Sequence, residues 1–237
     1  YMIDRNIGFI GLGNVGSKLA SNILQAGYNL FIYDIDENTS NELVNKGALW
    51  KNSVKDIIDN TSLIITCLPS PQAVTEVVEG KSGMIDYINN KHLWIEMSTT
   101  DEKEMIRLSK LIESKGANVL EAPVTGGQHK AESGNISILA AGKRKNFNRA
   151  LPILKEVGYN RTHFSVIFLS SKSFSLTIKE LLAILNIRKQ SLSKVINKLK
   201  EDGIILLKQS KKDKRKKNIY LTKKGIKIEK KMNQILL

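Results

Sequence analysis

The sequence has one cysteine, no long apolar run and no segment with the pattern of a signal peptide. The single cysteine, Cys67, excludes a disulfide framework within the chain, and its place in the apolar run LIITCL favours a buried structural thiol over a nucleophile. No stretch approaches the roughly 20 apolar residues that span a bilayer, and no signal peptide precedes the first predicted strand. These absences predict a cytoplasmic protein with no membrane partner, and we expect no metal site.

Acidic residues are scarce in the last third of the chain. The 237 residues include 37 Lys and Arg against 23 Asp and Glu, a formal charge of +14. Residues 161–237 hold 20 basic and 5 acidic residues, a charge of +15, whereas residues 1–160 hold 17 and 18, a charge of −1. This asymmetry predicts two modules, one nearly neutral and one suited to a polyanion such as nucleic acid or an anionic membrane, between which composition alone does not choose.

Short apolar runs alternate with helical patterns up to about residue 158. The runs are IGFIG, NLFIYD, LIITCL, HLWIEMS, NVLEAPV and ISILAAG. Strands that alternate with helices indicate right-handed βαβ crossovers and a mainly parallel sheet. We therefore predict a Rossmann-like, doubly wound α/β domain over residues 1–160, followed by a small α+β domain over residues 163–237.

A glycine-rich turn, GLGNVG, leads from the first predicted strand into a helix. Gly11, Gly13 and Gly16 have the G-x-G-x-x-G spacing, in which the first glycine makes the turn, the second admits a pyrophosphate and the third lets helix and strand pack closely. Asp34 ends the second strand, where a carboxylate accepts hydrogen bonds from ribose hydroxyls and repels a 2′-phosphate. The pattern predicts NAD in preference to NADP. The alternative is a tight turn without a ligand, with Asp34 as a helix cap.

Four ordered blocks resemble the β-hydroxyacid dehydrogenase family, to which 3-hydroxyisobutyrate dehydrogenase belongs. The blocks are GFIGLGNVGSKLASNILQAGYNLFIYDID, CLPSPQAVTEVV, IEMSTTD and EAPVTGGQHKAESGNISILAAG, over about residues 5–158. The resemblance implies a cofactor site made by Gly11, Leu12, Gly13, Asn14, Val15, Gly16, Asp34, Leu68, Pro69, Ser98 and Thr99. It also implies a site for a small hydroxy acid at Thr125, Gly126 and Gly127, where the family has Ser-Gly-Gly. If the other blocks were absent, Thr125-Gly126-Gly127 would be interpreted only as a turn at the end of a strand.

The resembled enzymes continue with a helical domain that carries a catalytic lysine and a nearby asparagine. That lysine exchanges the proton of the substrate alcohol while hydride moves to the cofactor. After LPILKEVGYN this chain has no matching G-x-x-x-K-x-x-N, and neither Lys172 nor Lys179 has the right context. The catalytic residue is therefore unknown. We expect efficient turnover to be absent, and the chain to be at most an NAD-dependent β-hydroxyacid dehydrogenase.

A different pattern begins near residue 163. In SLTIKELLAILNI, Thr177 and Glu180 have the spacing of a helix capping box. A second predicted helix has an apolar stripe made by Leu192, Val195, Ile196 and Leu199. Two short helices with a tight turn predict a helix-turn-helix. The polar face of the second would meet phosphates and base edges through Arg188, Lys189, Gln190, Ser191, Ser193, Lys194 and Asn197.

Two predicted strands, IILLKQ and NIYLT, are joined by the basic segment SKKDKRKK. With the helices before them they resemble the winged helix of the MarR family of bacterial transcription regulators, including the D-x-R and L-T-x-x-G signatures. The resemblance implies double-stranded DNA as partner, with Arg215 in the minor groove and Asp213 orienting it. Phosphate contacts are implied for Lys211, Lys212, Lys214 and Lys216. MarR proteins pair through terminal helices that are not found here, so a homodimer would need another interface.

Three functional hypotheses follow. The first is a DNA-binding transcription regulator whose α/β domain senses NAD(H) or a small hydroxy acid. The second is an oxidoreductase of the 3-hydroxyisobutyrate dehydrogenase type with an incidental basic tail. The third is a non-functional fusion of two truncated reading frames, which remains open because no Pro-rich linker or repeat marks a junction between Tyr159 and Ser173.

Overall fold

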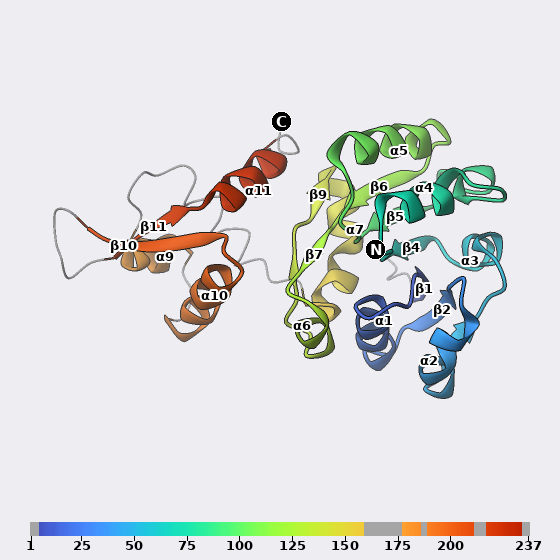
Figure 1. Cartoon of the computed structure of the whole chain (residues 1–237), viewed down its shortest axis with the longest axis horizontal. Helices are drawn as coiled ribbons and strands as arrows, with labels where there is room; N and C mark the ends of the chain where they lie inside the picture. The colour runs from blue at the N-terminus through green and yellow to red at the C-terminus, as the bar shows by residue number, and fades with distance from the viewer. Residues whose placement is uncertain (1–4, 159–176, 186–188, 211–216, 234–237) are drawn as a thin grey trace. The chain divides into compact units, whose positions relative to one another are not determined.

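The computed structural model describes residues 5–158, 177–185, 189–210 and 217–233. The chain divides into two compact units, Tyr1–Tyr159 and Asn160–Leu237 (Figure 1). The described residues of each unit include at least one β-sheet.

The first unit is built on a seven-stranded sheet in the order β3-β2-β1-β4-β5-β6-β9. Its strands are β1 (Asn6–Ile10), β2 (Asn29–Tyr33), β3 (Leu49–Trp50), β4 (Leu63–Thr66), β5 (Leu93–Glu96), β6 (Asn118–Glu121) and β9 (Ala141–Gly142). All neighbours pair in parallel except β9, which runs antiparallel to β6. The predicted doubly wound, mainly parallel sheet is thus confirmed.

Helices connect these strands and cover both faces of the sheet (Figure 1). They are α1 (Gly16–Gln25), the 3₁₀ helix η1 (Glu37–Ser40), α2 (Asn41–Asn45), α3 (Val54–Asn60), α4 (Pro71–Glu79), the 3₁₀ helix η2 (Met84–Asp86), α5 (Glu102–Ser114), α6 (Gln128–Glu132) and α7 (Arg144–Glu156). Several begin at a residue whose side chain accepts a hydrogen bond from the first turn, as Ser53, Ser70 and Asp101 do for α3, α4 and α5. Pro71 suits the first turn of α4 because it has no N–H to satisfy.

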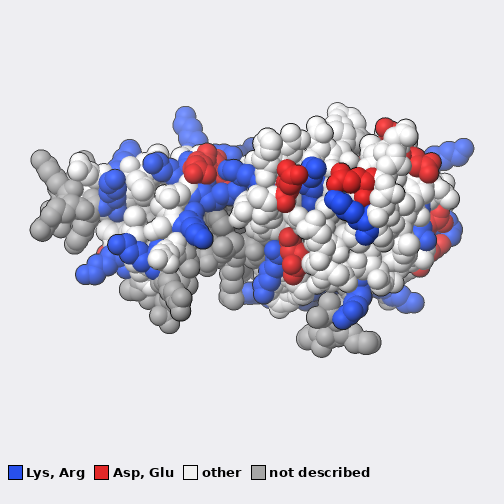
Figure 2. Space-filling view, turned by 90° about the horizontal axis from the view of Figure 1, so that it is seen from below, with Lys and Arg blue, Asp and Glu red and all other residues white. Residues whose placement is uncertain are grey.

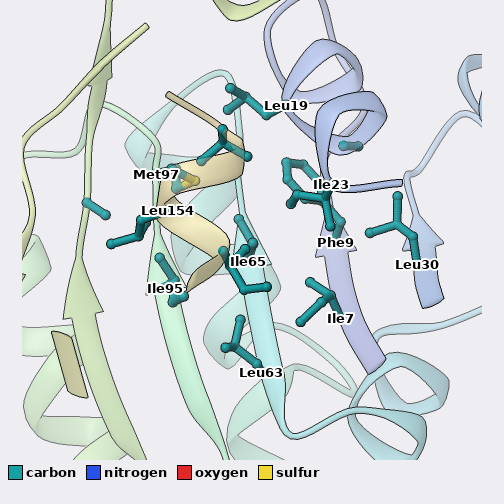
Figure 3. Close-up of a cluster of buried hydrophobic side chains, with 14 of the residues drawn as sticks. Ile7, Phe9, Leu19, Ile23, Leu30, Leu63, Ile65, Ile95, Met97 and Leu154 are labelled. Atoms are coloured by element: carbon teal, nitrogen blue, oxygen red, sulfur yellow. The ribbon is translucent and has the colours of Figure 1, made fainter. Parts of the chain in front are cut away.

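Alternate side chains of the strands enter two separate cores. Ile7, Phe9 and Ile65 pack with α1 and α7 on one face of the sheet (Figure 3). Ile64 of β4 and Trp94 of β5 pack with α3, α4 and α5 on the other face. Both faces are buried, so the strands are continuous apolar runs rather than alternating ones.

The second unit consists of α9 (Ile178–Leu185), α10 (Lys189–Glu201), β10 (Ile205–Gln209), β11 (Lys217–Leu221) and α11 (Lys223–Asn233), as far as it is described. The predicted capping box forms: the Glu180 amide donates to Thr177 Oγ1 (3.3 Å), and the Thr177 amide donates to Glu180 Oε2 (2.7 Å). The predicted apolar stripe of α10 is buried, and β10 and β11 form an antiparallel hairpin. The winged helix-turn-helix fold is confirmed.

Two short segments differ from the sequence prediction. The run ISILAAG was expected to form one strand, but it forms β8 (Ser137–Ile138), which pairs with β7 (Val124–Thr125), and then β9. The single-strand prediction was wrong because the chain passes from one ladder to another at residue 139, whose amide donates to the Pro123 carbonyl at 3.1 Å. Strand β3 was not predicted, since its two residues are too few to show a period.

The first prediction concerns this sheet. Ile65→Ala removes a fully buried side chain from the central strand β4, and we expect a loss of about 2–5 kcal/mol in the free energy of unfolding. Ile106→Ala, on α5 with half of its side chain exposed, should cost less than about 0.5 kcal/mol. Urea titration followed by tryptophan fluorescence measures both, because Trp50 and Trp94 both belong to the first unit. Equal losses would contradict the core assignment.

Candidate functional site

The glycine turn between β1 and α1 brings backbone segments unusually close. Gly11 has a φ of 98° and its amide donates to the Tyr33 carbonyl at 3.0 Å. A Cβ on Gly11 would overlap the Cys67 carbonyl oxygen, and one on Gly16 would overlap the Gly11 carbonyl oxygen. Gly13 differs, because it is exposed and a Cβ there would meet nothing within 4 Å. The fold therefore requires glycine at positions 11 and 16, whereas a side chain at position 13 would project into open space.

Helix α1 begins behind this turn without a side-chain cap. Its N-cap residue is Val15, and its first turn contains no acidic residue. Asn14 is exposed and Val15 is half-buried, while Leu12 is buried. An uncapped helix N-terminus next to an open glycine is suited to a phosphate group, since its amides and dipole both attract an anion.

Asp34 follows β2 and ties that strand to the glycine turn. Its Oδ2 accepts a hydrogen bond from the Leu12 amide at 2.6 Å, and its Oδ1 accepts one from the Asp36 amide at 3.0 Å. The cap of the following 3₁₀ helix is Asp36, which accepts from the Asn38 amide at 3.1 Å. Asp34 is therefore not the helix cap that the alternative required, and each of its oxygens keeps lone pairs for another donor.

The other predicted cofactor residues end neighbouring parallel strands and so lie at the same edge of the sheet. Leu68 and Pro69 follow β4, and Ser98 and Thr99 follow β5. Ser98 is buried, and its Oγ accepts a hydrogen bond from the Leu68 amide at 2.7 Å. Pro69 and Thr99 are exposed. The strand order reverses between β1 and β4, and such a reversal opens a crevice at the carboxyl ends of the strands.

The turn Thr125-Gly126-Gly127 joins β7 to α6. Gly126 and Gly127 are exposed with φ values of 136° and 78°, a conformation that favours glycine. Thr125 is half-buried and pairs with Ser137 of β8. Next to it, the Val124 amide donates to the Met97 carbonyl at 3.2 Å. This bond brings the turn close to the segment that carries Ser98.

The structure also reveals a buried acid that the sequence analysis missed. Glu96, the last residue of β5, has no exposed surface, and burial raises the pKa of its carboxyl to about 7. Its Oε1 accepts a hydrogen bond from the Ser98 amide at 2.5 Å, and its Oε2 accepts one from the Thr66 hydroxyl. The only indication of this group in the sequence was a glutamate at the end of the apolar strand LWIE.

Cys67 packs against the core, and burial together with the Glu96 charge raises the pKa of its thiol to about 12, in keeping with a structural thiol.

A polar groove of about 310 Å³ opens beside the glycine turn. It lies among α1, η1, α2 and α6 and is lined by Leu12, Gly13, Asn14, Ser17, Lys18, Ser21, Asn22, Gln25, Thr39, Glu42, Leu43, Lys46 and Glu132. Its charges are paired: Lys46 with Glu42 along α2 at 2.6 Å, and Lys18 of α1 with Glu132 of α6 at 3.6 Å. The groove borders the predicted phosphate loop at Gly13 and Asn14.

In the second unit, α10 presents a polar face opposite its buried stripe. Lys189, Gln190, Ser193, Lys194 and Asn197 are exposed, as predicted for a recognition helix. Figure 2 shows many Lys and Arg side chains and few acidic ones on the visible face of this unit, whereas the first unit shows both signs intermixed. Predicted contact residues Arg188, Lys211, Lys212, Asp213, Lys214, Arg215 and Lys216 lie outside the described residues, as does the Ser191 side chain.

The L-T-x-x-G signature fastens the hairpin to the end of α10. Thr222 Oγ1 donates to the Gly203 carbonyl at 2.6 Å and accepts from the Gly225 amide at 3.1 Å, which caps α11. A Cβ on Gly225 would overlap the Ile204 carbonyl oxygen. The threonine and the glycine thus hold α10, β11 and the start of α11 in one arrangement.

Two negative results apply to the described part of the chain only. It contains no group of three or more His, Cys, Asp or Glu residues that could hold a metal ion. None of its helices is long and apolar enough to cross a membrane.

Two segments of the chain match known protein families. Residues 6–166 match the family described as the NAD binding domain of 6-phosphogluconate dehydrogenase, and residues 157–216 match the MarR family. The 3-hydroxyisobutyrate dehydrogenase of Pseudomonas aeruginosa is 32% identical over 158 residues, which cover 67% of this chain and 53% of that protein. The mouse mitochondrial 3-hydroxyisobutyrate dehydrogenase is 34% identical over 154 residues, covering 65% and 46%. The chain thus spans about half the length of these curated relatives.

Solved structures share the fold. The Mycobacterium tuberculosis 3-hydroxyisobutyrate dehydrogenase with L-serine has a TM-score of 0.62 at 22% identity, covering 83% of this chain and 70% of that one. Psf3 in complex with NADP+ has a TM-score of 0.62 at 18% identity, covering 81% and 72%. By its match over residues 6–166 the chain belongs to the family of the NAD-binding domain of 6-phosphogluconate dehydrogenase, and it carries a MarR-family segment at residues 157–216.

Proposed function

We propose that this protein is a DNA-binding regulator whose first unit binds NAD and whose second unit binds duplex DNA. The observation that carries the proposal is the open position at Gly13, between an uncapped helix α1 and the Asp34 carboxylate. This arrangement offers backbone amides to a pyrophosphate and the Asp34 carboxylate to a ribose. The fold itself requires no side chain at Gly13.

NAD is proposed in preference to NADP. Asp34 is followed by Asp36 and Glu37, so a 2′-phosphate near the ribose would meet three acidic side chains. Repulsion of this kind raises the cost of binding NADP, although Psf3, with a similar fold, is named as a complex with NADP+. The proposed cofactor residues are the glycine turn, Asp34 and the two edge segments at Leu68 and Ser98.

A second candidate is an oxidoreductase acting on a small 3-hydroxy acid. The turn at Thr125, Gly126 and Gly127 favours it, since a hydroxyl and exposed amides next to the Ser98 segment could hold a carboxylate. Relatives named 3-hydroxyisobutyrate dehydrogenase also favour it. The part of this chain that follows α7 matches the MarR family instead of carrying the lysine motif of those enzymes. We therefore propose ligand binding rather than turnover as the role of the first unit.

The phosphate loop is tested at Gly13. In Gly13→Val the new side chain projects into open space, so the free energy of unfolding should be unchanged. If a pyrophosphate passes at this position, NAD affinity should fall by about tenfold or more, which corresponds to about 1.4 kcal/mol. Calorimetry measures the affinity and thermal unfolding measures the stability. Gly16→Ala is the contrasting variant, because its Cβ overlaps backbone and both quantities should fall. An unchanged affinity in Gly13→Val would refute the site.

The DNA interface is tested on the polar face of α10. Lys194→Ala should weaken binding to duplex DNA of any sequence and reduce the slope of log affinity against log salt by about 1, because one phosphate contact is lost. Lys110→Ala is the matched control, since it removes an equally exposed lysine from α5 of the first unit. Fluorescence anisotropy at several salt concentrations measures both variants. Identical slopes in the two variants would contradict an interface on α10.

The regulatory function is tested by measuring both ligands on one molecule. Saturating NAD should change the DNA affinity of the native chain by about fivefold or more, and saturating DNA should change the NAD affinity by the same factor, because linkage is reciprocal. Gly13→Val should abolish this change while leaving DNA affinity in the absence of NAD at its native value. Affinities that are identical alone and together would mean that the two units act independently, which is the outcome expected of an incidental fusion.

A further inference from the structure

Glu96 is a titratable group at the cofactor edge that the proposed binding chemistry does not use. It is the last residue of β5 and has no exposed surface. Burying a carboxylate costs free energy unless hydrogen-bond donors surround it. The donors around Glu96 therefore indicate the role of this side chain.

Two donors converge on this carboxylate. The Thr66 hydroxyl donates to Oε2, and the Ser98 amide donates to Oε1 at 2.5 Å. The Thr66 oxygen in turn accepts from the Trp94 indole N–H at 2.7 Å. Both carboxylate oxygens therefore act as acceptors, and protonation at Oε2 would set a new O–H against the Thr66 hydroxyl proton.

The hydrogen bonds extend from Glu96 to the segments proposed to hold NAD. Ser98 Oγ accepts from the Leu68 amide at 2.7 Å, so the segment after β5 is fixed to the segment after β4. The Met97 amide donates to the Thr66 carbonyl at 2.8 Å and continues the ladder between the same two strands. A shift of the Ser98 backbone would therefore disturb the hydrogen bond to the Leu68 amide as well.

The charge of Glu96 changes near neutral pH. Burial raises the pKa of its carboxyl to about 7, the bonds from Ser98 and Thr66 oppose this increase, and the Glu121 carboxylate on β6 adds to it. The neighbouring titratable group directly after β4 is the Cys67 thiol, whose pKa is raised to about 12 by burial and by the Glu96 charge, so it stays neutral over the same range. A glutamine at this position would replace one acceptor oxygen by an NH2 group, which would face the Ser98 amide or the Thr66 hydroxyl.

We propose that Glu96 is a positioning residue of the cofactor site, and that its ionised carboxylate holds the Ser98 segment and the Leu68 amide in the arrangement that binds NAD most tightly. The proposal rests on the NAD site proposed above. Because the ionised form predominates above the pKa, the affinity for NAD should rise as the pH increases from 6 to 8 and then level off.

The first measurement is NAD affinity against pH. In the native chain we expect an increase of about fivefold between pH 6 and 8, the factor that separates a hydrogen bond to a charged acceptor from one to a neutral acceptor. Glu96→Gln should bind NAD at every pH with the low affinity of the native chain at pH 6. Glu102→Gln, an exposed acid in the first turn of α5, is the matched control and should keep the native profile. A native pH profile in Glu96→Gln would overturn the proposal.

The second measurement follows the network without any ligand. The indole N–H of Trp94 is bonded to Thr66, so its NMR resonance should titrate with a midpoint near pH 7 in the native chain and stay constant in Glu96→Gln. The Trp50 resonance is the internal reference, since its indole donates to Asn52 instead. Absence of NAD binding at every pH, with a normal Trp94 titration, would refute the NAD site. Measurable but pH-independent binding in the native chain would refute the positioning role alone.

Discussion

The contact between Gly16 and the carbonyl of Gly11 determines how the first unit presents its ligand site. No side chain fits there, because a Cβ on Gly16 would overlap that oxygen, so helix α1 starts as close to the end of β1 as a backbone can. The same closeness points the N-terminus of α1 toward the carboxyl edge of the sheet, where the parallel strands β1, β4 and β5 end together. Asp34 fixes the remaining side of the turn through the Leu12 amide. The phosphate-binding geometry is therefore a property of the backbone, and Gly13 is the one glycine of the motif that the fold itself leaves free.

Comparable backbone contacts organise the second unit. Gly225 lies against the Ile204 carbonyl, and Thr222 bonds to Gly203 and to Gly225. These contacts orient the hairpin relative to α10 through uncharged groups. Lys189, Lys194 and Lys200 of α10 are exposed, in a part of the sequence with few acidic residues. A basic surface of this kind gains stability when phosphates neutralise it.

The sequence predicted those features that depend on local spacing. The glycine motif, the alternation of strands and helices, the capping box at Thr177 and the apolar stripe of α10 all follow from residues a few positions apart, and all were found. The network around Glu96 could not be predicted, because it joins Thr66 to Glu96 over 30 positions and depends on the register of β4 against β5. The bond from Leu12 to Asp34 has the same origin in strand pairing. The division of ISILAAG between two ladders was missed because a period of two residues does not specify the partner strand.

The two units handle negative charge in physically different ways. The first, with a net charge of −1 over residues 1–160, offers backbone amides and a helix dipole, whose attraction acts over the first turn of a helix and depends on close contact. The second, with +15 over residues 161–237, offers cationic side chains that can replace the counterions condensed on a polyanion, and this attraction acts over a Debye length and weakens with salt. On the function proposed above, a dinucleotide would use the first of these arrangements and a DNA duplex the second, so the two ligands would be recognised by chemically different sites.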